Sequence, residues 1–386
     1  MPAYARKEIV ADGEVGVYHC LARCVRRAYL CGQDALTGRN FEHRRAWIRT
    51  RLETLAGIFG VEVCGYAVMG NHLHAVLRTR PDVVAAWSDE QVGRRWWNLC
   101  PGRRDKQGRP AEPEEHEWRL LVADPAACAE RRKRLASLSW FMRALCEPIA
   151  RRANREDDCT GRFWEGRFKS QALLDEAALL ACSVYVDLNP IRAGLAATPE
   201  ESVFTSVHDR ITARQARNLL AARRTLPKDK VARGKRPDSV RPKLPAKGGV
   251  SADGWLVAFT LEERQAKGPG AGDLAAGNLA AGDFVAAEGR RASDRGYLPL
   301  DVEAYLELVD WTGRQVRLDK RGVIPAELRP ILERLAVATD GWVESVRHFG
   351  RWFHRAVGRV SNLRARASRS GKQWLHGIGR AQLAFT

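Results

Sequence analysis

Two histidines one residue apart, His72 and His74, lie in the segment VMGNHLHAVLR, which otherwise has the pattern of a strand, a turn and a second strand. Because alternate side chains of a strand point to the same face, we expect both imidazoles to project together. Two imidazoles on one face can share a divalent metal ion, but hydrogen-bonded or solvent-facing histidines produce the same pattern. The pair by itself leaves both interpretations open.

Tyr185 and Asn189 lie four residues apart in the segment SVYVDLNPIRAGLA, where a helix places them on one face. A tyrosine hydroxyl, with a pKa of about 10, can attack a phosphodiester when a divalent cation offsets the charge repulsion. A tyrosine on an amphipathic helix is more often part of the core. We expect a structural role for Tyr66 and a core or hydrogen-bonding role for His19, with an approach of His19 to a metal as the alternative. The residues alone do not decide the role of Tyr185.

The segment GRFWEGRFKSQ interleaves basic and aromatic residues. Basic groups neutralise phosphates and aromatic rings stack on unpaired bases, which is typical of nucleic-acid contact. The alternative is a solvated loop whose aromatic side chains are buried, and Glu165 is a further candidate metal ligand or base. The basic candidates are Arg162, Arg167 and Lys169, and the aromatic candidates are Phe163, Trp164 and Phe168.

The overall charge favours a polyanionic partner. The chain has 386 residues and a formal net charge of +18, and its arginines are spread along the whole length. Nucleic acid is therefore the leading partner, although an arginine-rich genome would produce the same bias. An anionic membrane surface is disfavoured, because no apolar run approaches the roughly 18 residues of a spanning helix.

The N-terminus and the cysteines indicate a cytoplasmic protein. The first residues have no apolar stretch followed by a small-residue cleavage site, so we expect no secretory signal. The nine cysteines include no CxxC pair, which predicts free and mostly buried thiols and disfavours a cysteine-based zinc site.

The elements that must carry these residues can be read from local patterns. Residues 15–25 are rich in β-branched and aromatic side chains and predict a strand. Residues 40–59 predict an amphipathic helix with Asn40 as its N-cap and Gly60 as its stop. Residues 61–78 predict a hairpin, since its Gly-Asn turn is a favoured two-residue connection.

Local patterns also predict the elements that follow residue 81. Residues 82–130 predict a helical insertion, in which a capping box at Ser88 starts one helix. Residues 130–154 predict one long helix, 161–174 a loop entering a strand, and 175–188 a helix capped by Asp175. The resulting β-α-β-β-α-β-α order predicts an α+β fold with a ferredoxin-like split βαβ arrangement and an antiparallel sheet.

The rest of the chain divides into two further parts. Residues 222–296 predict a basic, Gly/Ala/Pro-rich linker or partly disordered insertion, with a low-complexity repeat at 272–286. Residues 297–386 predict a basic helical region, whose first helix ends at Gly313. Residues 1–221 are then the domain that carries the candidate chemistry.

Four segments, in this order, resemble the single-tyrosine HUH transposases, the insertion-sequence 200-like and REP-associated tyrosine transposase group. They are VYHCLAR, VMGNHLHAVLR, GRFWEGRFKSQ and SVYVDLNPIRAGLA. The resemblance runs from about Val15 to Leu195. Gly70 stands where the family usually has a proline, which changes the stiffness of the turn rather than the chemistry.

The resemblance implies an HUH endonuclease domain that cleaves and rejoins single-stranded DNA at hairpin-bearing ends. It implies Tyr185 as the nucleophile of a 5′-phosphotyrosine intermediate and His72, His74 and Asn189 as ligands of Mg²⁺ or Mn²⁺. We expect a monomer or a homodimer. Two alternatives stay open, a domesticated nuclease that processes chromosomal palindromic repeats and a non-catalytic nucleic-acid-binding regulator. The expected DNA-binding residues are Arg162, Trp164, Arg167, Lys169 and Arg192.

Overall fold

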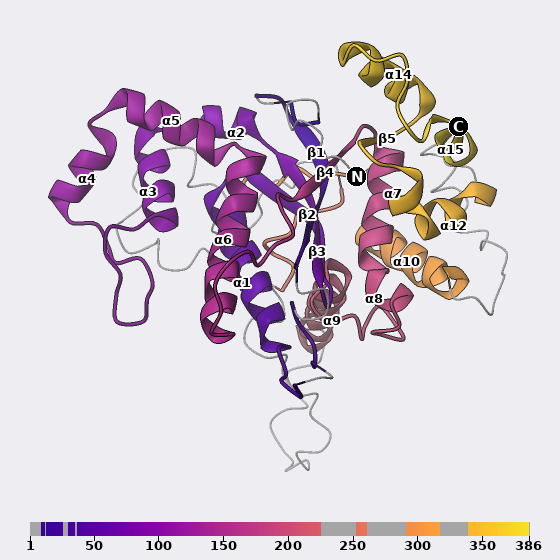
Figure 1. The fold of residues 1–386 in the computed structure, drawn as a ribbon, viewed down its shortest axis with the longest axis horizontal. Helices are drawn as coiled ribbons and strands as arrows, with labels where there is room; N and C mark the ends of the chain where they lie inside the picture. Colours follow the sequence, from indigo (N-terminus) through magenta and orange to yellow (C-terminus); the bar gives the residue numbers. More distant parts are fainter. Residues whose placement is uncertain are drawn as a thin grey trace.

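A computed structural model of the chain describes residues 9–11, 13–25, 30–34, 37–224, 252–260, 291–316 and 339–385. The expected repeat at 272–286 and nearly all of the basic stretch 221–250 lie outside these residues. The described part is a mixed α+β structure (Figure 1).

A five-stranded sheet forms the centre of the molecule, with strand order β2-β3-β1-β4-β5. Neighbouring strands are antiparallel except for β4 and β5, which are parallel. The predicted first strand, the hairpin and the strand after the basic loop are confirmed. The strands are β1 (Gly16–Arg23), β2 (Val61–Val68), β3 (His72–Thr79), β4 (Lys169–Leu173) and β5 (Ala356–Val357).

Two helices, α1 (His43–Ile58) and α6 (Leu138–Glu156), lie side by side on one face of the sheet (Figure 1). They cover the apolar side chains of β1 and β3, such as Tyr18 and Leu73, which are buried. Asn40 is not the N-cap of α1. Its side chain instead accepts a hydrogen bond from the backbone N–H of Glu42. Glu42 is the N-cap residue, and the helix begins at His43.

The predicted helix over 130–154 is wrong as a single element. The chain forms α5 (Pro125–Leu135) and then α6, because Ser137 interrupts the helix and its hydroxyl accepts the N–H of Trp140 as an N-cap. Pro148 lies inside α6 without ending it.

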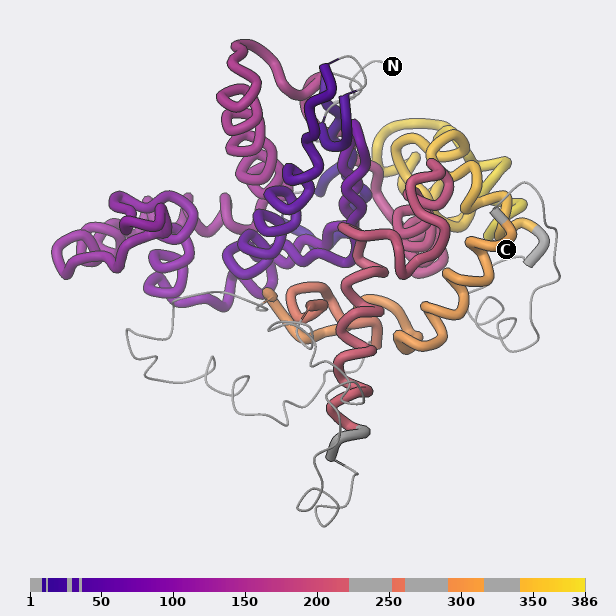
Figure 2. Tube along the Cα trace, turned by 90° about the horizontal axis from the view of Figure 1, so that it is seen from below, coloured from indigo at the N-terminus to yellow at the C-terminus, as the bar shows by residue number. Residues whose placement is uncertain are grey.

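The predicted helical insertion projects away from the sheet (Figures 1 and 2). The expected capping box at Ser88 is present, since Ser88 and Gln91 exchange hydrogen bonds at the start of the helix Asp89–Leu99. Besides α5, its helices are α2 (Pro81–Ala85), α3 (Asp89–Leu99) and α4 (Glu115–Val122).

The opposite face of the sheet is covered by α7 (Glu176–Asp187), capped by Asp175 as predicted. Asp187 at the end of α7 accepts hydrogen bonds from the hydroxyls of Ser206 and Tyr305. Burial raises the pKa of Asp187. This buried carboxyl joins α7 to α9 (Ser206–Arg224) and α10 (Val302–Val316).

Part of the expected linker belongs to the core. Trp255 is fully buried with its ring 5.2 Å from that of Tyr66, and the N–H of Val257 donates to the Val63 carbonyl over 3.0 Å. The apolar run GWLVAF covers the edge of β2. Charged residues on both sides of this short run dominate the average composition of the region, so composition did not indicate a buried segment. Residues 252–260, which lie within the expected linker or partly disordered insertion, are therefore packed against the core.

The expected C-terminal helical region is helical but also adds β5 to the sheet. Gly313 does not end its first helix. It lies inside α10, where a Cβ atom would be 3.1 Å from Leu188, so the glycine permits close packing rather than capping. Within the described part of this region, the other helices are α12 (Thr339–Arg347), α13 (Phe349–Trp352), α14 (Val360–Arg369) and α15 (Ile378–Ala384).

The remaining bulk expectations can be compared with the described residues. All nine cysteines lie within the described residues, none is joined in a disulfide bond, and six of them are buried. None of the described helices combines the length and the apolar character needed to cross a membrane.

Candidate functional site

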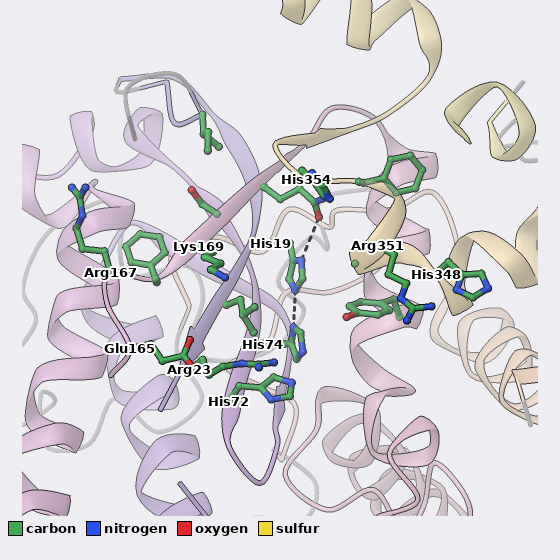
Figure 3. A pocket seen from close by; sticks show the side chains of 18 of the residues that line it. His19, Arg23, His72, His74, Glu165, Arg167, Lys169, His348, Arg351 and His354 are labelled. Carbon is green, nitrogen blue, oxygen red and sulfur yellow. Dashed lines mark hydrogen bonds between the residues drawn. The ribbon is translucent and has the colours of Figure 1, made fainter. Parts of the chain in front are cut away.

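Strand pairing gathers polar side chains on the face of the sheet that α7 covers. Leu21 on β1 lies opposite His74 on β3, and His19 on β1 lies opposite Gln171 on β4. Residues directly opposite each other share a face, as do alternate residues of one strand. His19, His72 and His74 therefore project toward the same side (Figure 3), and the pairing with His19 places Gln171 on that side as well.

A chain of hydrogen bonds links three of these side chains. His19 Nδ1 is 3.4 Å from Gln171 Oε1, and His19 Nε2 is 2.8 Å from His74 Nδ1. Burial lowers the pKa of His19 to about 4, so it is neutral near pH 7. A carboxamide oxygen only accepts, hence Nδ1 of His19 donates to Gln171 and its Nε2 accepts from His74. The proton of His74 is therefore on Nδ1, and Nε2 carries a lone pair.

His72 has the same tautomer as His74. Its Nδ1 is 2.5 Å from Asn71 Oδ1, so Nδ1 donates and Nε2 carries the lone pair. Burial lowers the pKa of His72 to about 4, and burial also lowers that of His74. The two rings lie edge to face with centroids 4.7 Å apart. Two neutral imidazoles on neighbouring rings thus each have an Nε2 lone pair free of the hydrogen bond at Nδ1.

Tyr185 on α7 lies against the histidines. Its ring centroid is 5.6 Å from that of His74 and 5.9 Å from that of His19, both edge to face. Phe349 on α13 stacks on the tyrosine ring at 5.2 Å, and the Arg192 guanidinium lies over it at 4.9 Å. The tyrosine is half-buried and held on several sides.

The chemistry of the Tyr185 hydroxyl follows from these neighbours. Burial raises the pKa of Tyr185, while the positive charge of Arg192 and hydrogen bonds from Arg192 and Asn189 act in the opposite direction. The tyrosine is therefore neutral at pH 7 and must lose its proton to act as a nucleophile. A Cβ atom at Gly350 would lie 3.0 Å from the hydroxyl oxygen, so the backbone there passes close to it.

Asn189 lies close to Tyr185 but not on the same helix. It begins the short helix α8 (Asn189–Arg192), after α7 ends at Asp187. Its Nδ2 donates to the Tyr185 carbonyl oxygen over 2.9 Å, which leaves Oδ1 as the atom able to bind a metal. The residue is 9% exposed.

The donor set suits a divalent metal. His74 Nε2 is buried and has no hydrogen-bond partner among the described residues, which is costly for a lone pair unless a ligand satisfies it. The other ring nitrogen of each imidazole is hydrogen-bonded, as is usual for metal-binding histidines. Among the described residues, no three His, Cys, Asp or Glu side chains form a metal-binding group, so an amide such as that of Asn189 would have to complete the set.

A cavity of about 750 Å³ opens over the histidines and Tyr185. Its floor is the sheet, and its far wall is the C-terminal segment 347–354 (Figure 3). Positive charges dominate the lining, which suits an anionic ligand. The charged side chains that line it are Glu165 and the cations Arg23, Arg167, Lys169, Arg192, Arg347 and Arg351.

The expected DNA-binding residues fall into two groups. Arg167, Lys169 and Arg192 line the cavity. Arg162 is exposed outside this lining, and the Trp164 indole donates to the Cys146 carbonyl over 2.8 Å while its ring packs against the core. Each of the two predictions for this loop therefore holds in part. Its basic side chains Arg167 and Lys169 line the cavity, as expected for nucleic-acid contact, whereas its aromatic side chains are partly buried.

The sequence interpretation missed the part of the site that comes from far along the chain. His348, Arg351 and His354 line the cavity, and Gln171 orients His19. The segment RHFGRWFH has the basic and aromatic mixture of a nucleic-acid contact, so its character was visible. Its position over Tyr185 was not, because that depends on pairing between β5 and β4.

The fold and site define a mixed α+β protein with a basic cavity that contains neutral histidines and a tyrosine. Comparison with known protein families and with curated proteins finds no match. A solved structure of a REP-associated tyrosine transposase bound to a REP hairpin aligns with 13% identity over 64% of this chain and 97% of that chain. The TM-score is 0.32.

Proposed function

We propose that the chain cleaves and rejoins single-stranded DNA through a covalent 5′-phosphotyrosine at Tyr185. One observation carries the proposal: α7 brings Tyr185 within ring contact of His74, more than a hundred residues earlier, inside a cation-lined cavity. A half-buried tyrosine beside neutral imidazoles and cations able to bind phosphate has the groups that phosphodiester transfer needs.

The ferredoxin-like arrangement is part of the proposal. The β-α-β-β-α-β order and the strand order β2-β3-β1-β4 support a split βαβ unit, to which β5 adds an edge strand. This support is independent of the motif resemblance, since it comes from hydrogen-bond pairing.

His72, His74 and Asn189 are the proposed ligands of Mg²⁺ or Mn²⁺. Two Nε2 lone pairs and the unused Oδ1 of Asn189 are the atoms that would bind it. A bound divalent ion would withdraw charge from the non-bridging oxygens of the scissile phosphate. An oxygen-preferring ion with mixed ligands is consistent with this donor set.

In the proposed reaction the Tyr185 hydroxyl gives its proton to solvent water and its oxygen attacks phosphorus. The new bond joins the tyrosine oxygen to phosphorus, and the bond from phosphorus to O3′ breaks. The electron pair of that bond goes to O3′, which takes up a proton and leaves as a 3′-hydroxyl. Arg192 favours the phenolate by its positive charge. Because one phosphodiester replaces another, a 3′-hydroxyl can reverse the step without ATP.

Arg167 and Lys169 are proposed to hold the DNA backbone at the mouth of the cavity. Both side chains are exposed, so their charges are available to phosphates. The motif resemblance favours a hairpin next to the cleaved single strand as the substrate.

The test is formation of a covalent adduct. Hairpin-bearing single strands are incubated with the protein and Mg²⁺ or Mn²⁺, and an adduct that survives denaturation is expected from the wild type. Tyr185→Phe retains the ring that stacks on Phe349, so it should bind DNA but form no adduct. If the wild type binds hairpins and forms no adduct on any of them, the non-catalytic alternative holds instead.

A further inference from the structure

We propose a second binding site for single-stranded DNA, formed by the C-terminal segment and adjoining the tyrosine cavity. This C-terminal subsite takes a nucleotide of the strand that extends beyond Tyr185, and it rests on the proposed function for the identity of its ligand. It is an open hollow of about 510 Å³. Its lining residues are Arg351, Trp352, His376, Gly377, Gly379, Arg380 and Leu383.

Strand pairing fixes the subsite relative to the cavity. The N–H of Ala172 on β4 donates to the Arg355 carbonyl over 2.8 Å, and that of Leu174 donates to Val357 over 2.9 Å. Phe349, two residues before Arg351, stacks on Tyr185. The segment is therefore attached on both sides of Arg351, and its position over the cavity does not depend on a single contact.

Arg351 connects the two spaces. It lines both the tyrosine cavity and the C-terminal subsite, and its side chain is exposed. Figure 3 shows it on the C-terminal side of the cavity, across from His19 and His74. A strand whose phosphate lies at Tyr185 can therefore continue past Arg351 without leaving a positively charged surface.

The subsite has the groups that bind an unpaired nucleotide. The Arg380 guanidinium lies 5.1 Å from the centroid of the Trp352 ring. His354 and His376 stack with centroids 4.0 Å apart and planes 2° apart, and His376 is exposed. An exposed ring at the end of a stack can accept a nucleobase on its outer face, whatever the base.

The two cations that line the subsite are uncompensated. Arg351 and Arg380 are exposed and form no ion pair with the described residues. In the helical insertion, by contrast, exposed arginines pair with carboxylates four residues away, as in Arg119 with Glu115. Unpaired guanidinium groups next to exposed aromatic rings favour a phosphate backbone over an uncharged partner.

The experiment measures DNA affinity by fluorescence anisotropy, in EDTA and in the Tyr185→Phe background, so that no cleavage occurs. The probes are one hairpin without tails and the same hairpin with a single-stranded tail on its 5′ or its 3′ side. The test variant is Arg380→Ala with His376→Ala. The control is Arg109→Ala with Arg119→Ala, which removes exposed arginines of the insertion.

We expect the test variant to bind at least one tailed hairpin about tenfold more weakly, and the tailless hairpin as before. The salt dependence of tailed binding should also become shallower by about 0.7 in the log–log slope for the lost phosphate contact. The control should bind every probe like the parent. Unchanged tailed affinity, or an equal loss on the tailless hairpin, would overturn the subsite.

The subsite and the proposed function can fail separately. If the wild type forms the adduct and the tail effect is absent, only the subsite is wrong. If the tail effect is present and no adduct forms, the reaction is wrong and the DNA site stands. Circular dichroism of the variants shows whether they are folded, and Arg380→Ala alone provides a milder substitution at an exposed position.

Discussion

At the scale of single residues, the hydrogen bond between His19 and His74 determines which ring nitrogen of His74 faces the cavity. Gln171 sets the tautomer of His19, and His19 in turn places the proton of His74 on Nδ1. His19 is thus a positioning residue in the proposed metal site, where the sequence favoured a core or hydrogen-bonding role.

We predict that His19→Ala weakens Mn²⁺ binding about tenfold, which is the usual cost of losing a partner of a metal-binding histidine. Isothermal titration calorimetry without DNA gives the affinity, and ¹⁵N NMR of the metal-free protein shows whether His74 loses its Nδ1–H tautomer. Gln171→Glu is the control, because a carboxylate also accepts from His19 Nδ1. Unchanged affinity and tautomer in His19→Ala would contradict the positioning role.

The buried histidines also predict acid sensitivity of the metal-free protein. Burial lowers the pKa of His19 to about 4, against about 6.5 in an unfolded chain. Between these values the unfolded state binds more protons, so stability falls as the pH falls from 6.5 toward 4. From pH 7 to pH 5 the expected loss from His19 is about 2 kcal/mol.

Urea unfolding in EDTA at pH 7 and pH 5 measures this loss. His19→Gln has no titrating group at this position and should lose correspondingly less stability over the same interval. Equal losses in the two proteins would show that His19 does not titrate as its burial requires.

At the scale of elements, α12 and α15 cross closely at Gly341. A Cβ atom there would overlap the carbonyl oxygen of Leu383. Gly379 on α15 has open space around the same position. Both glycines lie in helices, but the close helix crossing requires a glycine only at position 341 and not at position 379.

We predict that Gly341→Ala destabilises the protein by about 2 kcal/mol, because the two helices must move apart. Gly379→Ala should be neutral or stabilising by up to about 1 kcal/mol, since alanine has the higher helix propensity. Urea unfolding monitored by circular dichroism compares the two variants. A Gly341→Ala protein as stable as the wild type would mean that the helices do not pack as described.

At the scale of the whole molecule, segments from all parts of the chain share one core. Arg78 on β3 pairs with the buried Glu62 and donates to the carbonyl of Gly296. Trp255 packs on Tyr66, and Phe349 packs on Tyr185. The C-terminal half is therefore a structural part of the unit that carries the candidate site.

We predict that Gly296→Ala destabilises the whole protein by about 3 kcal/mol or more, because its Cβ would overlap the carbonyl of Thr260. Gly166→Ala, in a loop with open space, is the matched control. Thermal unfolding should show a lower midpoint only for Gly296→Ala. A solvated linker at this position would instead tolerate both substitutions equally.

The sequence by itself determined the short-range features of this protein. Alternation along a strand placed His72 and His74 on one face, and the Gly-Asn turn joined their strand to the one before it. Side-chain caps at Ser88 and Asp175 marked two helix starts. These features depend on dihedral preferences and hydrogen bonds within a few residues, which the local sequence contains.

Only the tertiary structure decided what surrounds these residues. The position of β1 between β3 and β4 brings His19 and Gln171 to His74, and the pairing of β5 with β4 brings Arg351 to the cavity that Tyr185 lines. Trp255 enters the core from a stretch whose composition indicated a linker. Such contacts join segments more than fifty residues apart and are selected by the burial of complementary surfaces, so no local pattern could specify them.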